Sequence, residues 1–208
     1  TSNRRRGWRW YSAVDRWMYG RYRKVICISS KAEDNLRRHI GKSRAEIMTI
    51  NNGVDVENYA SAPASQELER VAPGIRKIMM VAGFRWEKDQ DTLINTLAHL
   101  PEKFHLFLVG DGVRRRECEA LASQTGVAGR VHFLGIRSDV PSLLQSADYV
   151  VMSSHFEGLS LSSVEGMSVG KPFLASDVDG LREVVGGAGI LFPHGNAEFL
   201  AAAITSLE

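Results

Sequence analysis

Residues 149–166, YVVMSSHFEGLSLSSVEG, contain the pattern on which the fold assignment depends. The first four residues are apolar without interruption, which predicts a buried strand. Farther along, Leu161, Val164 and Met167 recur at the spacing of one helical face. Gly170 and Pro172 follow, and they predict the end of that helix. The stretch therefore predicts a strand, a tight loop and the N-terminus of a helix.

The predicted loop and helix N-terminus have residues suited to binding an anionic, hydroxylated ligand. Free backbone N–H groups and a partial positive charge at a helix N-terminus suit a phosphate. Gly158 would let the backbone come close to a ligand. Glu157 on the loop could accept hydrogen bonds from hydroxyls, and Glu165 in the helix could hold a vicinal diol such as a ribose. The alternative is that both carboxylates are solvated surface charges and that Ser160 is an ordinary N-cap.

The two glutamates and their surroundings resemble the E-x7-E signature of the retaining glycosyltransferases of family 4, the glycosyl transferases group 1, which have the two-domain GT-B architecture. The match continues through residues 166–172, GMSVGKP, with Gly166 where that family commonly has alanine. The resemblance implies that Glu157 contacts the donor sugar and that Glu165 contacts the nucleotide ribose. The backbone expected to meet the sugar and phosphates is that of Gly158, Leu159, Ser160, Leu161 and Ser162.

The composition of the 208-residue chain is that of an ordinary soluble globular protein of one or two domains, with 44% hydrophobic and 24% charged residues. A net charge of +2 is too small to indicate nucleic acid. The two cysteines have no metal-ligand spacing and fit a reducing compartment. No apolar run is long enough for a membrane span, and no signal peptide is recognisable. We therefore expect a cytoplasmic protein, and the missing initiator methionine indicates that the chain begins inside a longer one.

Residues 1–24 are rich in both basic and aromatic side chains. Tyr11, Val14, Met18 and Tyr22 fall on one helical face, which predicts a helix packed on a neighbour. Peripheral contact with anionic lipid at the inner face of the cytoplasmic membrane is the second interpretation. Nucleic acid is disfavoured, because no nucleic-acid motif accompanies the charge.

The domain organisation follows from the next segments. Strands are predicted at 25–28 and 46–50 with a helix at 31–39 between them, and the sequence INNGVD at 50–55 resembles the end of the N-terminal domain in the same glycosyltransferases. We expect three parts: residues 1–58 as a remnant of the acceptor-side domain, 59–74 as a linker, and 75–208 as the donor-binding domain without its last helix.

Strands and helices alternate regularly from residue 77 onwards, which predicts an α/β, Rossmann-like parallel sheet with helices on both faces. The predicted strands are 78–82, 104–109, 131–134, 149–152, 172–175 and 189–192, and the predicted helices between them include 91–100, 114–124 and 139–146. Ligands of such sheets bind outside the carboxyl ends of the strands, so the loops that follow the strands are the candidate sites.

The loop after the first of these strands contains two cations that could meet a diphosphate, Arg85 and Lys88. It resembles the G-R-L-x-x-x-K-G loop of the same family, although Gly83 stands where the family has its arginine. The resemblance implies that Lys88 and Arg85 stabilise the leaving diphosphate. Together with Glu157 they form the predicted catalytic set.

Two further loops complete the predicted donor site. The resemblance implies that Gly110 and Gly112 let a nucleotide approach, and that the backbone at Gly135 and Ile136 reads the base. Gly83 is predicted to belong to the same donor-binding set. A dinucleotide-binding fingerprint is disfavoured, because Arg115 stands where its third glycine would be.

The sequence therefore predicts a retaining, metal-independent glycosyltransferase that uses a nucleotide-sugar, UDP-sugar rather than GDP-sugar, and no cofactor. The expected acceptor is a glycan or lipid-linked acceptor of the bacterial surface polysaccharide type, and the chain alone is expected to be inactive. A non-catalytic nucleotide-binding module, a GT-B sugar-nucleotide epimerase and a phosphorylase are the alternatives. No metal site is predicted. Five histidines show no ligand spacing: His39, His99, His105, His132 and His194. His155 adjoins the Glu157 loop and could touch the donor, but a packing or hydrogen-bonding role is favoured.

Overall fold

The computed structural model describes residues 9–41, 43–50, 53–70, 74–158 and 160–208. Its contacts divide the chain into two compact units, Thr1–Gly53 and Val54–Glu208. The predicted domain boundaries at 58 and 74 stay a prediction, and each unit is described by itself.

The first unit has two helices and two short strands: α1 (Arg9–Tyr19), β1 (Lys24–Cys27), α2 (Ser30–Ile40) and β2 (Glu46–Thr49). The strands pair in parallel, with Val25 opposite Ile47. Ser29 caps α2, because its side chain accepts a hydrogen bond from the Ala32 N–H at 3.2 Å. A small cluster formed by Cys27, Leu36 and Ile40 is the core of this unit.

The N-terminal helix is confirmed, but three of the four side chains that we expected to pack are exposed, and the fourth, Tyr11, lies outside the described side chains. Val14, Met18 and Tyr22 have exposed side chains, and α1 ends before Tyr22. Tyr19 packs on the small core instead. The prediction of a buried face was therefore wrong for these three side chains, because the helix contacts its unit one position away from the predicted stripe.

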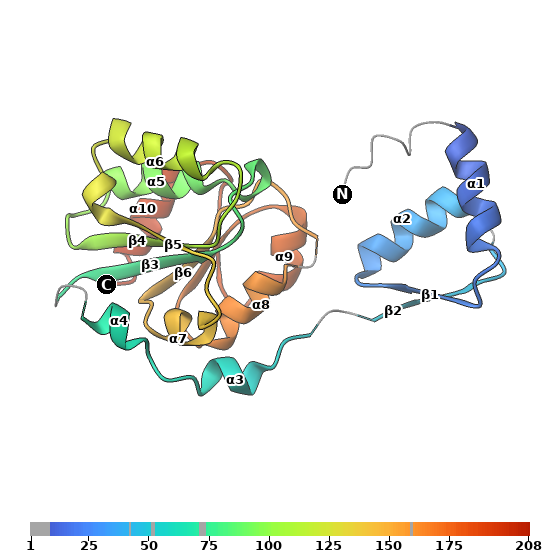
Figure 1. The fold of residues 1–208 in the computed structure, drawn as a ribbon, viewed down its shortest axis with the longest axis horizontal. Helices are drawn as coiled ribbons and strands as arrows, with labels where there is room; N and C mark the ends of the chain where they lie inside the picture. The colour runs from blue at the N-terminus through green and yellow to red at the C-terminus, as the bar shows by residue number, and fades with distance from the viewer. Residues whose placement is uncertain (1–8, 42, 51–52, 71–73, 159) are drawn as a thin grey trace. The chain divides into compact units, whose positions relative to one another are not determined.

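The second unit is built on six parallel strands (Figure 1). In chain order they are β3 (Arg76–Val81), β4 (Phe104–Val109), β5 (Val131–Gly135), β6 (Tyr149–Met152), β7 (Phe173–Ser176) and β8 (Ile190–Phe192). They lie side by side in the order β5-β4-β3-β6-β7-β8. The predicted α/β sheet is confirmed, and its strands are mostly apolar because both faces are covered.

Helices cover both faces of this sheet. They are α5 (Gln90–Ala98), α6 (Arg115–Gln124), α7 (Val140–Gln145), α8 (Leu161–Ser168), α9 (Asp179–Val185) and α10 (Ala197–Thr205). Figure 1 shows α5, α6 and α10 on one side of the strands and α7 and α8 on the other, where α9 packs beside α8. Phe104, Phe107 and Phe192 lie in the core between the layers, each at most 1% exposed.

The strand order reverses direction between β3 and β6, the two strands at the centre of the sheet. From β3 the chain moves outward through β4 to β5, and from β6 it moves outward the other way through β7 to β8. The loops that leave the carboxyl ends of β3 and β6 therefore run to opposite faces. Such a reversal opens a crevice between the two loops, which is where ligands of these sheets bind.

The predicted linker carries secondary structure and packs on the second unit. It overlaps α3 (Val56–Ala60) and contains α4 (Gln66–Glu69), and Leu68 is 1% exposed. The Ser65 N–H donates to the carbonyl of Ser142, and the amide of Gln145 donates to the carbonyl of Tyr59. Much of this segment is therefore held by α7 and the core and does not behave as a free connector.

Within the described residues, no helix is both long and apolar enough to cross a bilayer. Cys27 and Cys118 are buried free thiols. Burial raises the pKa of the Cys118 thiol to about 12, and the nearby Asp91 carboxylate adds to this effect. A thiol with such a pKa is protonated at neutral pH and unreactive.

Candidate functional site

The loops after β3 and β6 are joined by an ion pair at the point where the strand order reverses. Lys88 Nζ lies 2.5 Å from Glu157 Oε1, and the same oxygen accepts a hydrogen bond from Ser154 Oγ at 2.8 Å. The two side chains are 21% and 11% exposed, so the pair is shielded and yet reachable from the crevice. The structure therefore brings together two of the three residues predicted to be catalytic.

The backbone of the loop after β3 is fixed by several contacts. A short 3₁₀ helix, η2 (Trp86–Lys88), leads into Asp89, which has a left-handed φ of 51° and caps α5. Ser153 Oγ, at the end of β6, donates to the carbonyl of Asp89 at 2.7 Å. This bond ties the two loops together, so the position of Lys88 is set by backbone contacts and not by its ion pair alone.

The loop after β6 leads into the N-terminus of α8. Ser160 caps this helix, with its side chain accepting from the Ser163 N–H at 3.3 Å. Gly158 is exposed, and no heavy atom lies within 4 Å of where its Cβ would be. Leu161 is 40% exposed and Ser162 is half-buried, whereas the predicted contact Leu159 lies outside the described residues. Gly158 therefore borders open space, and the helix end that follows it offers the kind of N–H groups that suit an anion.

Gly180, in the first turn of α9, is a residue of this site that sequence analysis did not assign. A Cβ on Gly180 would lie 2.2 Å from the carbonyl oxygen of Glu157 and 2.4 Å from that of Gly158. Only glycine permits this approach, so α9 supports the Glu157 loop from behind. The signal in the sequence is a glycine in the first turn of a helix, which is too common to be assigned a role by itself.

Glu165 contacts α3, which lies beside α8. Burial, which is the largest cause, and the nearby carboxylate of Glu165 together raise the pKa of Tyr59 to about 12. The Tyr59 hydroxyl therefore lies near the carboxylate of Glu165, which is half-buried on α8. Sequence analysis missed this partner, because Tyr59 lies in the predicted linker.

The glycines of the loop after β4 are packed against the loop after β3. A Cβ on Gly110 would lie 2.2 Å from the carbonyl oxygen of Ala82, and a Cβ on Gly112 would lie 2.4 Å from that of Phe84. Gly83, between those two residues, is half-buried, and its carbonyl accepts from Gln90 Nε2 at 3.1 Å. Gly110 and Gly112 are thus required for the packing of the two loops. Their predicted role in the approach of a nucleotide stays a prediction.

The loop after β5 contributes an open backbone segment. Gly135 has φ +68°, and its carbonyl accepts from the Gly110 N–H at 2.8 Å. Ile136 follows it and is 83% exposed. Arg115 lies close to Gly135, with its guanidinium 5.8 Å from the ring of Phe133. Sequence analysis treated Arg115 only as a missing glycine, and the structure places it beside Gly135 and ion-paired with Glu119 at 2.9 Å.

Arg85 does not join the Lys88–Glu157 pair. Its side chain is 71% exposed, and its Nη1 lies 4.0 Å from Glu87 Oε1. The carbonyl of Arg85 accepts the hydrogen bond that starts η2, from the Lys88 N–H at 3.0 Å. The third predicted catalytic residue is therefore an exposed cation beside Glu87, outside the Lys88–Glu157 pair.

The described crevice combines a shielded cation, a carboxylate and a helix N-terminus. The cation and the helix end attract a phosphate or diphosphate, and the carboxylates accept hydrogen bonds from hydroxyl groups. A ligand that carries both a diphosphate and sugar hydroxyls matches this arrangement.

Comparisons with known proteins agree with this geometry. The chain matches the family described as Glycosyl transferases group 1 over residues 75–208 and the one described as Glycosyltransferase Family 4 over residues 1–58. A putative glycosyltransferase of Bacillus subtilis, EpsD, is 30% identical to it over 97% of this chain and 56% of that protein.

Solved structures of similar proteins also match most of the chain. Anabaena HepE in complex with UDP and glucose has a TM-score of 0.81 at 26% identity, over 94% of this chain and 56% of that one. The glycosyltransferase WaaG, involved in lipopolysaccharide biosynthesis, has a TM-score of 0.76 at 26% identity, over 95% and 58%. The chain spans about half the length of the curated relatives it matches.

A substitution of Gly112 tests the close packing of the two glycine-containing loops. Gly112→Ala should lower the free energy of unfolding by about 2–4 kcal/mol, because the new methyl group would overlap the backbone of Phe84. Gly129→Ala, where no atom lies within 4 Å, is the matched control and should change it by less than about 0.5 kcal/mol. Urea unfolding followed by circular dichroism measures both, and equal stability of the two variants would contradict the packing.

The contact between Tyr59 and Glu165 predicts a pH dependence. Glu165→Gln should lower the pKa of Tyr59 from about 12 while leaving it above the ordinary value, because burial, the largest cause, remains. The folded state keeps a proton that the unfolded state releases, so the stability contributed by Tyr59 is present below pH 10 and is lost as the pH rises towards 12. Phenolate absorbance, with Tyr59→Phe identifying the signal, measures the shift, and an unchanged titration would refute the contact.

Proposed function

This chain belongs to the glycosyl transferases group 1 family, which has the GT-B fold, and we propose that it is the donor-binding part of a nucleotide-sugar-dependent glycosyltransferase. The observation that carries the proposal is the Lys88–Glu157 pair at the reversal of strand order, beside the N-terminus of α8. The chain spans about half of its relatives, so we expect turnover from the longer protein and not from this chain alone.

In the proposed mechanism the diphosphate of the donor takes the place of Glu157 at Lys88 Nζ. Lys88 and the N-terminus of α8 then stabilise the charge that grows on the leaving diphosphate, an effect that is often the largest catalytic contribution. Arg85, an exposed cation on the same loop as Lys88, adds a second positive charge. In other transferases a metal ion stabilises the negative charge of the leaving diphosphate. Here the protein cations and the helix N-terminus would do so, and departure of the diphosphate would need no metal ion.

Glu157, released from Lys88, orients the sugar by accepting hydrogen bonds from its hydroxyls. We propose transfer with retention of configuration, in which the leaving diphosphate assists on the same face as the incoming acceptor. Glu157 is not assigned as a glycosidase-type nucleophile, because no second carboxylate is placed as the partner acid of such a pair among the described site residues.

The nucleotide is proposed to be a uridine diphosphate. HepE was solved with UDP and with UDP-glucose, and it covers 94% of this chain. Glu165 would hold the ribose diol, with Tyr59 fixing the orientation of the carboxylate, and the open backbone at Gly135 and Ile136 would meet the base. No cofactor is needed in this scheme.

The acceptor is proposed to be a glycan or a lipid-linked glycan of a bacterial surface polysaccharide. The similarity to WaaG, a glycosyltransferase involved in lipopolysaccharide biosynthesis, supports this proposal. Such an acceptor would place the protein on the cytoplasmic side of the membrane. The first unit offers a matching surface, since Trp17, Met18 and Tyr22 are exposed and the Arg21 guanidinium lies 4.5 Å from the centre of the Trp17 ring.

Calorimetric titration of the chain with nucleoside diphosphates tests the donor site. UDP should bind more tightly than GDP or ADP, with or without magnesium. Glu165→Gln should weaken UDP binding about tenfold or more, because a charge-assisted hydrogen bond to the ribose is worth roughly 1.5–3 kcal/mol. Lys88→Ala should reduce turnover in the full-length protein, because the leaving group loses its cation.

The control variant is Glu198→Gln, which removes a carboxylate on α10, outside the donor loops, and should leave the affinity unchanged. Unchanged UDP binding by Glu165→Gln would contradict the ribose role. A full-length protein that binds UDP but consumes no donor would be a non-catalytic module, and one that converts donor without acceptor would be an epimerase.

Sedimentation with vesicles tests the proposed membrane contact. Binding to vesicles that contain anionic lipid should fall several-fold for Trp17→Ser and should weaken with added salt, since it combines apolar burial with charge attraction. Val113→Ser, at an 88% exposed position of the second unit, is the control. Equal binding to neutral and anionic vesicles, or none to either, would rule the contact out.

A further inference from the structure

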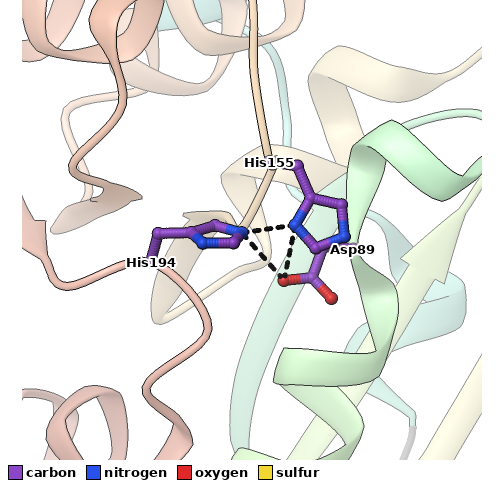
Figure 2. A group of neighbouring side chains, drawn as sticks. All are labelled: Asp89, His155 and His194. Carbon is purple, nitrogen blue, oxygen red and sulfur yellow. Dashed lines mark hydrogen bonds and ion pairs between the residues drawn. The ribbon is translucent and has the colours of Figure 1, made fainter.

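Two histidines and an aspartate meet beside the crevice without a role in the proposed transfer. Asp89, His155 and His194 each present one metal-binding atom, and these atoms all lie within 4.8 Å of one another. Figure 2 shows the two rings and the carboxylate converging from three separate stretches of chain. Asp89 caps α5, His155 follows β6, and His194 follows β8. No sequence spacing could reveal the group, because its members are 39 to 105 residues apart.

Two of the three separations are close to those of ligands around one small cation. His155 Nδ1 and His194 Nε2 each lie 3.7 Å from the same oxygen, Asp89 Oδ2. Ligand atoms about 2.0–2.1 Å from a tetrahedral zinc ion are about 3.3 Å apart. The two ring nitrogens also face each other in a hydrogen bond. A cation between the three atoms would need only a small separation of the rings.

The surroundings of the group resemble the outer shell of a metal site. Thr92 Oγ1 donates to Asp89 Oδ2 at 2.6 Å and orients the carboxylate. The Asp89 side chain is 6% exposed and His155 is 21% exposed, whereas His194 is 37% exposed, so solvent reaches the fourth position. A second histidine pair, His105 with His132, has no carboxylate ligand beside it among the described residues.

Burial lowers the pKa of both of these histidines. The charge of Arg130 lowers the pKa of His105 further.

We propose that Asp89, His155 and His194 bind a divalent transition-metal ion of the zinc type, with water in the fourth position. Two imidazole nitrogens and one carboxylate oxygen suit zinc and disfavour magnesium, which prefers oxygen ligands. The two facing ring nitrogens are hydrogen-bonded to each other in the structure, and metal coordination would replace that hydrogen bond.

The bound ion would join the loop after β8 to the loops after β3 and β6, which the Ser153–Asp89 hydrogen bond and the Lys88–Glu157 pair already connect. Asp89 directly follows Lys88, and His155 precedes Glu157 by two residues. The ion thereby acts as a positioning element for the two loops of the crevice and not as a ligand of the diphosphate. The metal site does not depend on the proposed glycosyl transfer, since it can be present in a protein that binds no nucleotide.

Cobalt and zinc titrations of the metal-stripped chain test the site. One equivalent of Co²⁺ should bind and give the visible absorption of a tetrahedral centre, and Zn²⁺ should displace it while millimolar Mg²⁺ should not. His194→Gln should weaken Co²⁺ and Zn²⁺ binding by about tenfold or more, since the loss of even an outer-shell partner costs about 10- to 100-fold. Zn²⁺ should raise the thermal unfolding temperature of the unsubstituted chain and not that of the variant.

His99→Gln is the matched control, because His99 is also exposed and lies at the end of α5, outside the group. Asp89→Asn, which keeps a capping oxygen and tolerates the left-handed backbone, should weaken binding as His194→Gln does. Metal-free unfolding temperatures verify that each variant folds. Absence of Co²⁺ and Zn²⁺ binding, or binding that the Asp89 and His194 variants leave unchanged, would overturn the proposal, whatever the outcome of the nucleotide titrations.

Discussion

The reversal of strand order between β3 and β6 is the constraint on which the site depends. Parallel strands must send their connections over the faces of the sheet, and a change of direction sends two neighbouring connections to opposite faces. The crevice that results is a property of topology and needs no particular side chain. The side chains of this chain then complete it, with Lys88 on one loop and Glu157 on the other.

The Lys88–Glu157 pair is shielded enough from solvent for its charges to act strongly on each other and on a ligand. In bulk water two such charges attract weakly, whereas a partly buried pair feels a lower effective dielectric constant. The same environment makes the loss of either partner costly, because the remaining charge stays partly desolvated. A bound diphosphate can therefore replace Glu157 as the partner of Lys88, so the cation stays paired. Glu157 must then accept hydrogen bonds from hydroxyl groups of the ligand at the same time.

The strands and most helices could be predicted from the sequence, since a sheet covered on both faces requires uninterrupted apolar runs. Lys88 and Glu157 could be predicted because they lie in recognisable loops, but their contact could not, as it joins residues 69 positions apart. Tyr59 was missed because alanine, serine and proline around it indicate a linker. The tight contacts of Gly110, Gly112 and Gly180 depend on neighbouring backbones, which no local pattern reports.

Those glycine contacts restrict how this chain can change its ligand preference. Where a glycine touches a neighbouring carbonyl group, any larger residue forces two loops apart, so a mutation there affects folding before it affects recognition. Gly158 and Ile136 border open space, and side chains there can vary without moving the backbone. Directed evolution of this chain towards a new donor should therefore randomise these open positions and leave the packed glycines untouched.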